Sequence, residues 1–233
     1  MVKSSTPALD LRIDWASHDA AKFASTHWHY SKSMPLPPLV KVGVWECQKF
    51  IGVVIFSRGA SNTLLKPYGL NQDEGCELTR IALKNHVAPV SKIISIALKF
   101  LKQNSPKLRL VVSFADPTYG HSGIVYQASN WLYAGTTAPS KEYFKNGKRL
   151  HNRQVSAKGY EIQFGKKIKT PKPSECIVKV TDGKYRYLMA LDESMKEKIL
   201  PLSKPYPKRA KGQDAGHHPT LGGSTPTCAL QIV

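Results

Sequence analysis

The sequence predicts a mixed α/β (α+β) domain followed by a basic, β-rich region. Of its 233 residues, 41% are hydrophobic, which is enough for one sizeable core. The predicted elements before residue 140 follow the order β-β-β-α-β-α-β, in which helices cover a sheet. From Pro201 onward Pro, Gly, Ser, Thr and Lys dominate. We therefore expect a core over 1–140, a basic extension packed on it over 141–200, and a disordered tail over 201–233.

A helix and three strands are expected first. A short helix runs from Asp19 to about Ser25, and prolines at 35, 37 and 38 keep the following chain extended. Leu39–Glu46 and Phe50–Ser57 are rich in valine and isoleucine, which predicts a hairpin. A polar loop over 58–72 then leads to a third strand over Glu77–Lys84.

Two helices and two strands complete the predicted core. Pro89 opens a helix to about Gln103, because apolar residues recur there at three- and four-residue spacing. Leu108–Phe114 has the composition of a buried strand, and a short helix over Gly123–Asn130 and a strand over Trp131–Gly135 follow. Beyond the core, Asn146-Gly147 and Asp182-Gly183 are both typical of hairpin turns.

The charge balance points to a polyanionic partner. The chain has 34 Lys and Arg against 16 Asp and Glu, a formal net charge of +18. Basic side chains that bind phosphates release condensed counterions, which favours binding to a polyanion. We therefore expect the chain to contact double-stranded DNA; the alternative is that the charge only keeps the protein soluble. The expected backbone clamp lies in the extension: Lys141, Lys145, Lys148, Arg149, Arg153, Lys166 and Lys167.

Other classes of protein are disfavoured. Residues 1–20 have no apolar run typical of a signal peptide, and no apolar stretch is long enough to cross a bilayer, so we expect no membrane partner. The four cysteines form no C-x-x-C pair, which argues against a zinc ribbon or a disulfide framework and fits reduced thiols in a cytoplasm. A homodimer is left open.

The order of elements resembles that of the GCN5-related acetyltransferases (GNAT). The run Glu77–Leu83 resembles their fourth strand. This resemblance implies a splayed mixed sheet with a cleft between the fourth and fifth strands, where an acyl donor binds. One segment departs from the family: Asn85–Ser91, at the expected pyrophosphate loop, has no glycine, and Pro89 removes one N–H donor. Ordinary acyl-coenzyme A binding is therefore in doubt.

Three further segments resemble the Mom family of bacteriophage Mu. They are His27-Trp28-His29-Tyr30-Ser31-Lys32-Ser33; Lys66-Pro67-Tyr68-Gly69-Leu70 with Glu77–Leu83; and Asp116-Pro117-x-x-Gly120-His121-x-Gly123-x-x-Tyr126-Gln127-Ala128-x-Asn130-Trp131. Together they cover roughly 27–135. The resemblance implies a phage enzyme, in the host cell cytoplasm, that converts adenine in DNA to N6-carbamoylmethyladenine. A bulky group on N6 would then block restriction enzymes that read this edge of the base.

The motif after the buried strand supplies two candidate catalytic residues. Asp116 could accept a proton from the exocyclic amine or orient it, although Asp-Pro is also an ordinary turn and helix cap. Tyr126 matches a tyrosine that protonates the leaving group in acetyltransferases, and a tyrosine packed in the core is the alternative.

The remaining candidates come from several segments. The catalytic set is completed by His29, Tyr30 and Arg80, and the substrate-binding set is Ser113, Tyr119, His121, Trp28 and Lys32. Trp28 and Tyr30 could stack on a flipped base or simply pack. His27 and His29 could share one face of an extended chain and, with Asp116, bind a metal ion, for which the resemblance to the Mom family implies iron.

The donor and the reaction have alternatives. A glycyl-tRNA-type donor supplies both carbons and the nitrogen of a carbamoylmethyl group, whereas acetyl-coenzyme A supplies no nitrogen. The chain could instead be a conventional GNAT acyltransferase acting on a small-molecule or protein amine, or a non-catalytic DNA-binding accessory protein.

Overall fold

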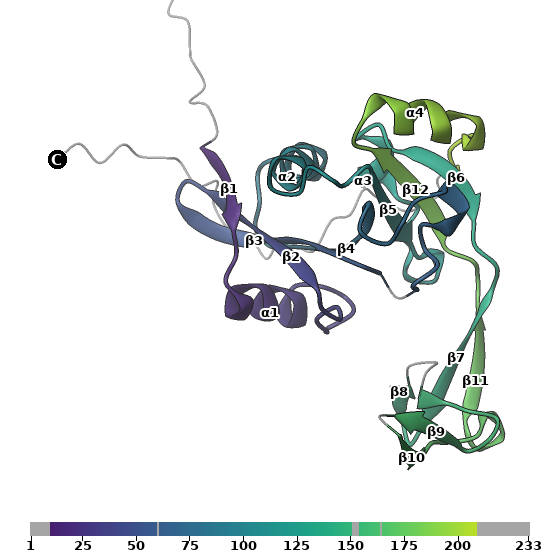
Figure 1. Cartoon of the computed structure of the whole chain (residues 1–233). Helices are drawn as coiled ribbons and strands as arrows, with labels where there is room; N and C mark the ends of the chain where they lie inside the picture. Colours follow the sequence, from purple (N-terminus) through teal and green to yellow (C-terminus); the bar gives the residue numbers. More distant parts are fainter. Residues whose placement is uncertain (1–9, 60, 151–153, 164, 209–233) are drawn as a thin grey trace, which may run out of the picture. The chain divides into compact units, whose positions relative to one another are not determined.

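The computed structural model describes residues 10–59, 61–150, 154–163 and 165–208, which divide into two compact units (Figure 1). The core unit comprises the described residues up to Phe114, Gly123–Gly135, and those from Arg186. The arm unit comprises Ala115–Ser122 and Thr136–Tyr185. Residues 186–200, which the sequence assigns to the extension, thus belong to the core unit.

A seven-stranded mixed sheet is the main feature of the described residues, with strand order β1-β2-β3-β4-β5-β12-β6. The strands are β1 (Leu11–Trp15), β2 (Leu39–Glu46), β3 (Lys49–Ser57), β4 (Gly75–Leu83), β5 (Leu110–Ala115), β12 (Tyr185–Ala190) and β6 (Leu132–Thr136). β1 to β4 pair antiparallel, whereas β4 and β5 are parallel. The predicted mixed sheet and the β2–β3 hairpin are confirmed.

The sheet splays between β4 and β5. Their pairing runs from Gly75↔Leu110 to Leu78↔Ser113 and then stops, although β4 continues to Leu83. Beyond Leu78, β4 therefore no longer pairs with β5. This is the splay that the sequence predicts.

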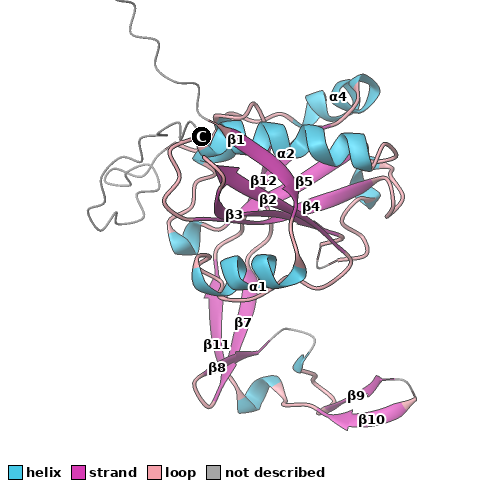
Figure 2. Ribbon diagram, turned by 90° about the vertical axis from the view of Figure 1, so that its left-hand side faces the viewer, coloured by secondary structure: helices cyan, strands magenta, loops and turns pink. Residues whose placement is uncertain are grey.

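Helices cover both faces of the sheet (Figure 2). On one face, α1 (His18–His27) buries Ala21 and Ala24 against β3 and β4, and Ser17 caps its first turn. On the other face lies α2 (Val90–Asn104), which begins after Pro89 as predicted. Its apolar stripe is buried: Ile93, Ile94, Ala97, Leu98 and Leu101. No helix in the described part of the chain is long and apolar enough to cross a membrane.

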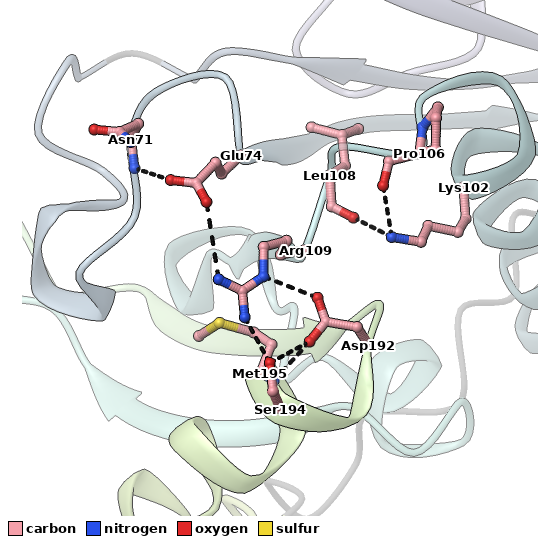
Figure 3. A network of polar contacts seen from close by, with 9 residues as sticks. All are labelled: Asn71, Glu74, Lys102, Pro106, Leu108, Arg109, Asp192, Ser194 and Met195. Atoms are coloured by element: carbon pink, nitrogen blue, oxygen red, sulfur yellow. Dashed lines mark hydrogen bonds and ion pairs between the residues drawn. The ribbon is translucent and has the colours of Figure 1, made fainter.

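Helix α4 (Glu193–Ile199) packs on β5 and β12 through Met195 and Ile199. Its first turn is tied to the start of β5 by Arg109, whose guanidinium donates to Asp192 at 3.0 Å and to Ser194 at 2.6 Å, and lies 3.8 Å from Glu74 (Figure 3). This network fixes the end of the sheet opposite the splay.

The segment after α4 differs from the prediction of a disordered tail at 201. Following the 3-10 turn η5 (Leu200–Leu202), the N–H of Lys204 donates to the Tyr133 carbonyl at 2.9 Å. The Tyr206 hydroxyl donates to the Trp131 carbonyl at 2.9 Å. These two hydrogen bonds join residues far apart in sequence, and they attach the segment 201–208 to β6 of the core unit. The remainder of the predicted tail lies outside the described residues.

The arm unit contains two small sheets. One has the order β11-β7-β8, from β7 (Ser140–Lys145), β8 (Lys148–Leu150) and β11 (Ile177–Thr181). The other is the hairpin of β9 (Tyr160–Gln163) and β10 (Lys166–Lys169). The hairpin predicted at Asn146-Gly147 is confirmed, and both residues have positive φ.

The hairpin predicted at Asp182-Gly183 is wrong. β11 pairs with β7, whereas β12 enters the seven-stranded sheet, so Asp182-Gly183 connects two sheets. Gly183 is needed for a close backbone approach, since a Cβ there would lie 1.8 Å from the Thr137 carbonyl oxygen. The expectation of reduced cysteines also needs correction: Cys76 and Cys176 are free thiols, but Cys47 is disulfide-bonded.

Candidate active site

Tyr126 lies at the splay of the sheet. It belongs to the short helix α3 (Ile124–Gln127) and is buried, with 8% of its surface exposed. Its hydroxyl is 2.8 Å from Ser113 Oγ, which is also 2.8 Å from the carbonyl oxygen of Leu78. Leu78 and Ser113 form the last residue pair between β4 and β5. The phenol is therefore held where the two strands part.

The surroundings of Tyr126 favour its protonated form. Burial raises the pKa of Tyr126, the hydrogen bond with Ser113 opposes this, and Tyr30, Glu77 and Tyr187 raise it further. A phenol with a raised pKa remains a proton donor at neutral pH. The phenol is therefore in the protonated form that a general acid needs and not in the form of a general base, although the raised pKa also makes it a weaker acid.

Tyr187 supports this position from β12. It is fully buried, its ring centroid lies 5.1 Å from that of Tyr126, and Gln127 Nε2 donates to its hydroxyl at 3.0 Å. Gly123 has φ +80°, and a Cβ on it would lie 2.2 Å from the Tyr187 ring. The glycine of the motif thus lets α3 start against Tyr187. Sequence reasoning missed Tyr187, since only its β-prone neighbours gave a signal.

The segment after α1 supplies His29 and Tyr30. His29 is buried, and its Nδ1 accepts the Ser31 N–H at 3.1 Å, which leaves the proton of a neutral imidazole on Nε2. Its ring lies against Tyr30, with centroids 4.3 Å apart. Tyr30 acts electrostatically on both Tyr126 and Arg80. The structure therefore brings His29, Tyr30, Arg80, Ser113 and Tyr126 together in the core unit.

Arg80 is the cationic group of this set. Its Nε donates to the Ser33 carbonyl at 3.3 Å and another guanidinium nitrogen donates to the Thr79 carbonyl at 2.7 Å. Burial lowers the pKa of Arg80, an effect that Tyr30 and Glu77 oppose. The guanidinium retains its charge and can meet an anionic part of a substrate.

Two other candidates from the same segment have local roles. Trp28 is the C-cap of α1 and packs with Phe50 on the cluster beneath α1. Lys32 Nζ donates to the His27 carbonyl at 2.8 Å and thereby caps the helix end. Both side chains stabilise the position of His29 and Tyr30.

The expected geometry for iron is not found. His27 is the last residue of α1 and not part of an extended chain, and its Nδ1 lies 2.9 Å from the Phe23 carbonyl. Nowhere in the described ranges do three His, Cys, Asp or Glu side chains form a group that could hold a metal ion. The iron site at His27, His29 and Asp116 stays a prediction.

Asp116 lies in the arm unit and caps the 3-10 turn η2 (Pro117–Tyr119). It is buried; one carboxylate oxygen lies 3.0 Å from Lys184 Nζ and the other accepts the Thr118 N–H at 3.0 Å. Burial alone would raise the pKa of Asp116, but the hydrogen bonds and charge of Lys184 and Thr118 outweigh it and lower the pKa. An ion-paired carboxylate of this kind is a weak base. Lys184 gave no signal in the sequence.

The other two residues of this loop lie at the surface. Tyr119 is 46% exposed. Desolvation lowers the pKa of His121, and the charge of Asp116 opposes the shift. Their side chains remain candidates for contact with a base.

The predicted clamp residues lie on the arm sheets. Lys141, Lys148, Lys166 and Lys167 are exposed, whereas Lys145 pairs with Glu175 at 2.6 Å. Arg149 is in β8, and Arg153 lies outside the described residues. The arm unit therefore has a basic surface spread over β7, β8 and β10.

The start of α2 does not fit the pyrophosphate of coenzyme A. The N–H groups of Val87 and Ala88, which precede the helix, donate to the Glu46 carboxylate at 2.8 and 2.6 Å. Glu46 is buried, with 6% of its surface exposed. A carboxylate of the protein thus takes the hydrogen bonds that a phosphate would need, and its charge would repel one. Sequence reasoning missed Glu46.

A cavity of about 750 Å³ lies elsewhere in the core unit, between β6, β12, α4 and the segment 203–206. None of the predicted site residues lines this cavity. The candidate site therefore lies at the splay, where side chains are joined by hydrogen bonds, and not at this cavity.

Comparisons with known proteins agree with the motifs. The model of the Mom protein family matches residues 10–208. The Methylcarbamoylase mom of Escherichia phage Mu is 27% identical over 206 residues, 85% of this chain and 84% of that protein. A putative acetyltransferase from Acinetobacter baylyi ADP1 has a TM-score of 0.44 and 10% identity, covering 86% of this chain and 99% of its own. An N-acetyltransferase from Staphylococcus aureus Mu50 has the same TM-score and identity, covering 78% and 97%. These structural similarities are too distant to carry an argument.

Proposed function

Because the chain belongs to the Mom protein family, we propose that it is a DNA-modifying transferase that converts adenine to N6-carbamoylmethyladenine. Such a group would protect phage DNA from restriction in the host cytoplasm. The family match over residues 10–208 is the observation that carries this proposal. The exposed lysines of the arm unit support DNA as the substrate.

Adenine N6 in a duplex is paired and stacked, so the base must leave the helix before it reacts. This costs roughly a few kcal/mol, which contacts with the extruded base and the backbone must offset. Tyr30 is close enough to act electrostatically on Tyr126 and Arg80, and His29 packs on Tyr30. These are the groups we assign to the base and donor. Tyr119 and His121 are the corresponding candidates of the arm unit.

The chemistry of the product favours a glycyl ester as donor. Acyl transfer would place a glycyl group on N6, with its carbonyl attached to N6 and its amine at the far end. The carbamoylmethyl group is an isomer of it, with the methylene on N6 and the amide at the far end. A rearrangement between them needs no oxidant or reductant. Glu46, which takes the N–H groups before α2, argues against acyl-coenzyme A.

Tyr126 has a defined part in this scheme. As the bond between N6 and the glycyl carbonyl forms and the ester C–O bond breaks, the leaving oxygen needs a proton, which the buried phenol can donate. The proton that N6 loses in the same step then restores the phenol. Ser113 holds the phenol at the splay. The carboxylate of Asp116 orients the loop rather than removing the proton from the amine.

The test is to express the protein in bacteria, digest the cellular DNA to nucleosides, and analyse deoxyadenosine by mass spectrometry with fragmentation. We expect a fraction of deoxyadenosine with a carbamoylmethyl group whose methylene is on N6, and carbon and nitrogen label from isotopic glycine in that group. Unmodified deoxyadenosine, despite soluble protein that binds DNA, would refute the proposal and favour an accessory protein. Acetylated small molecules or proteins would favour a conventional acyltransferase.

A further inference from the structure

The hairpin β9–β10 presents two faces of different chemistry. Its antiparallel register pairs Lys167 with Ile162 and Lys169 with Tyr160, so these four side chains share one face. We call this the groove face. The opposite face contains Glu161 and Ile168, which are paired, together with Lys166.

Neither face of this hairpin is covered by a core. All four residues of β10 are exposed, and Ile162 and Ile168 are 72% and 43% exposed. A two-stranded hairpin is marginally stable in water by itself, and an isoleucine this exposed on it gains nothing from packing in the free protein. Its burial in a complex would supply that gain.

The charges of the groove face identify the kind of partner. It has two lysines and no acidic residue, whereas the opposite face has Glu161. Lys167 Nζ lies 4.0 Å above the centre of the Tyr160 ring, which orients the lysine along the face. Both cations lie along β10, and Ile162 lies opposite Lys167 on β9, so the face offers cations to a phosphate wall of a DNA groove and an apolar side chain to the base edges beside it.

We propose that the groove face enters the minor groove of duplex DNA and that Ile162 inserts as a wedge at a base step. Apolar side chains that enter this groove unstack neighbouring bases and kink the duplex toward the major groove. The same unstacking lowers the cost of extruding an adenine, whose N6 lies on the major-groove side. This proposal rests on the proposed function, because it takes DNA as the substrate.

The two isoleucines provide a matched pair for the test. A duplex with 2-aminopurine beside the target site reports unstacking as a rise in fluorescence when the full-length protein is added. We expect Ile162→Ala to lose most of this rise even at saturating protein, and Ile168→Ala to keep it. Circular dichroism and the midpoint of thermal unfolding check that both variants fold. Equal signals from the two variants, or a normal signal from Ile162→Ala, would overturn the proposal.

The lysines of the groove face should act on affinity rather than on unstacking. In the double variant Lys167→Ala/Lys169→Ala, the slope of log K against log salt should fall by about two, one for each lost phosphate contact. The fluorescence rise should return once the variant saturates the duplex. An unchanged slope would contradict the assigned face, and tighter binding to an RNA duplex of the same sequence would identify RNA as the partner instead.

These measurements separate this proposal from the proposed function. They need no donor and no reaction. Normal modification of DNA by Ile162→Ala would refute the wedge alone, whereas wild-type protein that unstacks DNA but never modifies it would refute the function alone.

Discussion

Tyr126 and Asp116 come from one sequence motif, yet their surroundings differ in kind. Tyr126 is buried among aromatic rings and a serine hydroxyl in the core unit, and these surroundings raise its pKa. Asp116 is buried beside Lys184 in the arm unit, and its pKa is lowered. Burial raises the pKa of both groups, but Asp116 has a neighbouring cation, Lys184, that reverses the shift. Proximity in a motif therefore does not give two residues the same chemical role.

The largest effect should come from Gly123→Ala, which breaks the support of Tyr126. The new Cβ would collide with the Tyr187 ring in a left-handed backbone conformation, at a cost of roughly 3 kcal/mol. Gly147→Ala is the matched control: its φ is also positive, but a Cβ there meets nothing within 4 Å, so the cost is about 1 kcal/mol. Urea unfolding measures both, and equal losses would show that Tyr187 does not constrain α3.

Tyr126→Phe removes the proposed acid and keeps the ring. We expect modification of DNA to fall by about 100-fold or more, with DNA binding unchanged. Tyr133→Phe, at another buried tyrosine that packs on Tyr187, should retain near-normal modification. Nucleoside analysis after single-turnover reaction gives the rates. A modest loss shared by both variants would indicate packing and no acid role.

Asp116→Asn tests the contrast from the other side. The amide oxygen can still accept the Thr118 N–H, and Lys184 is exposed enough to be hydrated. We expect modification to fall only about tenfold, since a carboxylate with a lowered pKa is a poor base. Asp116→Ala, which also removes the cap, should lose far more. An Asn variant as inactive as the Ala variant would restore Asp116 as a base.

The smallest effect concerns Asp192, an ion-paired carboxylate that is distant from the candidate site. The hydrogen bond from Arg109 contributes most to lowering the pKa of Asp192 to about 2. The ionised Asp192 carboxylate therefore stabilises the folded protein at pH values above its unfolded pKa, near 3.9. This contribution is lost as the pH falls from about 4 toward 2. Because the side chains are partly exposed, we expect Asp192→Asn to cost about 1 kcal/mol or less at pH 7 and less still at pH 3. Urea unfolding at both pH values gives the difference, and a cost that grows at low pH would contradict this assignment.

Local patterns in the sequence predicted the elements whose stability is local. The valines of β2 and β3, and the apolar spacing of α2, identify these elements almost to the residue. The hairpin predicted at Asp182-Gly183 was wrong because these residues favour a turn but do not determine strand pairing. β12 pairs with β5 and β6, which lie far away in sequence. A turn signal says nothing about which strands will pair.

The candidate site was predicted in part for the same reason. Motifs identified Tyr126, Tyr30 and Arg80, which the structure brings together. They did not identify Tyr187, which packs on Tyr126, or Lys184, which pairs with Asp116, because these residue types are ordinary on the surface or in strands. Only the fold shows that Lys184 neutralises Asp116 or that Glu46 fills the anion position before α2.

One measurement tests the central claim most directly: nucleoside analysis of DNA from cells that express the wild type or Tyr126→Phe at equal levels. We predict N6-carbamoylmethyl-deoxyadenosine in the wild-type sample and at most a trace in the variant. Unmodified deoxyadenosine in the wild type, or equal modification in both samples, would contradict the account.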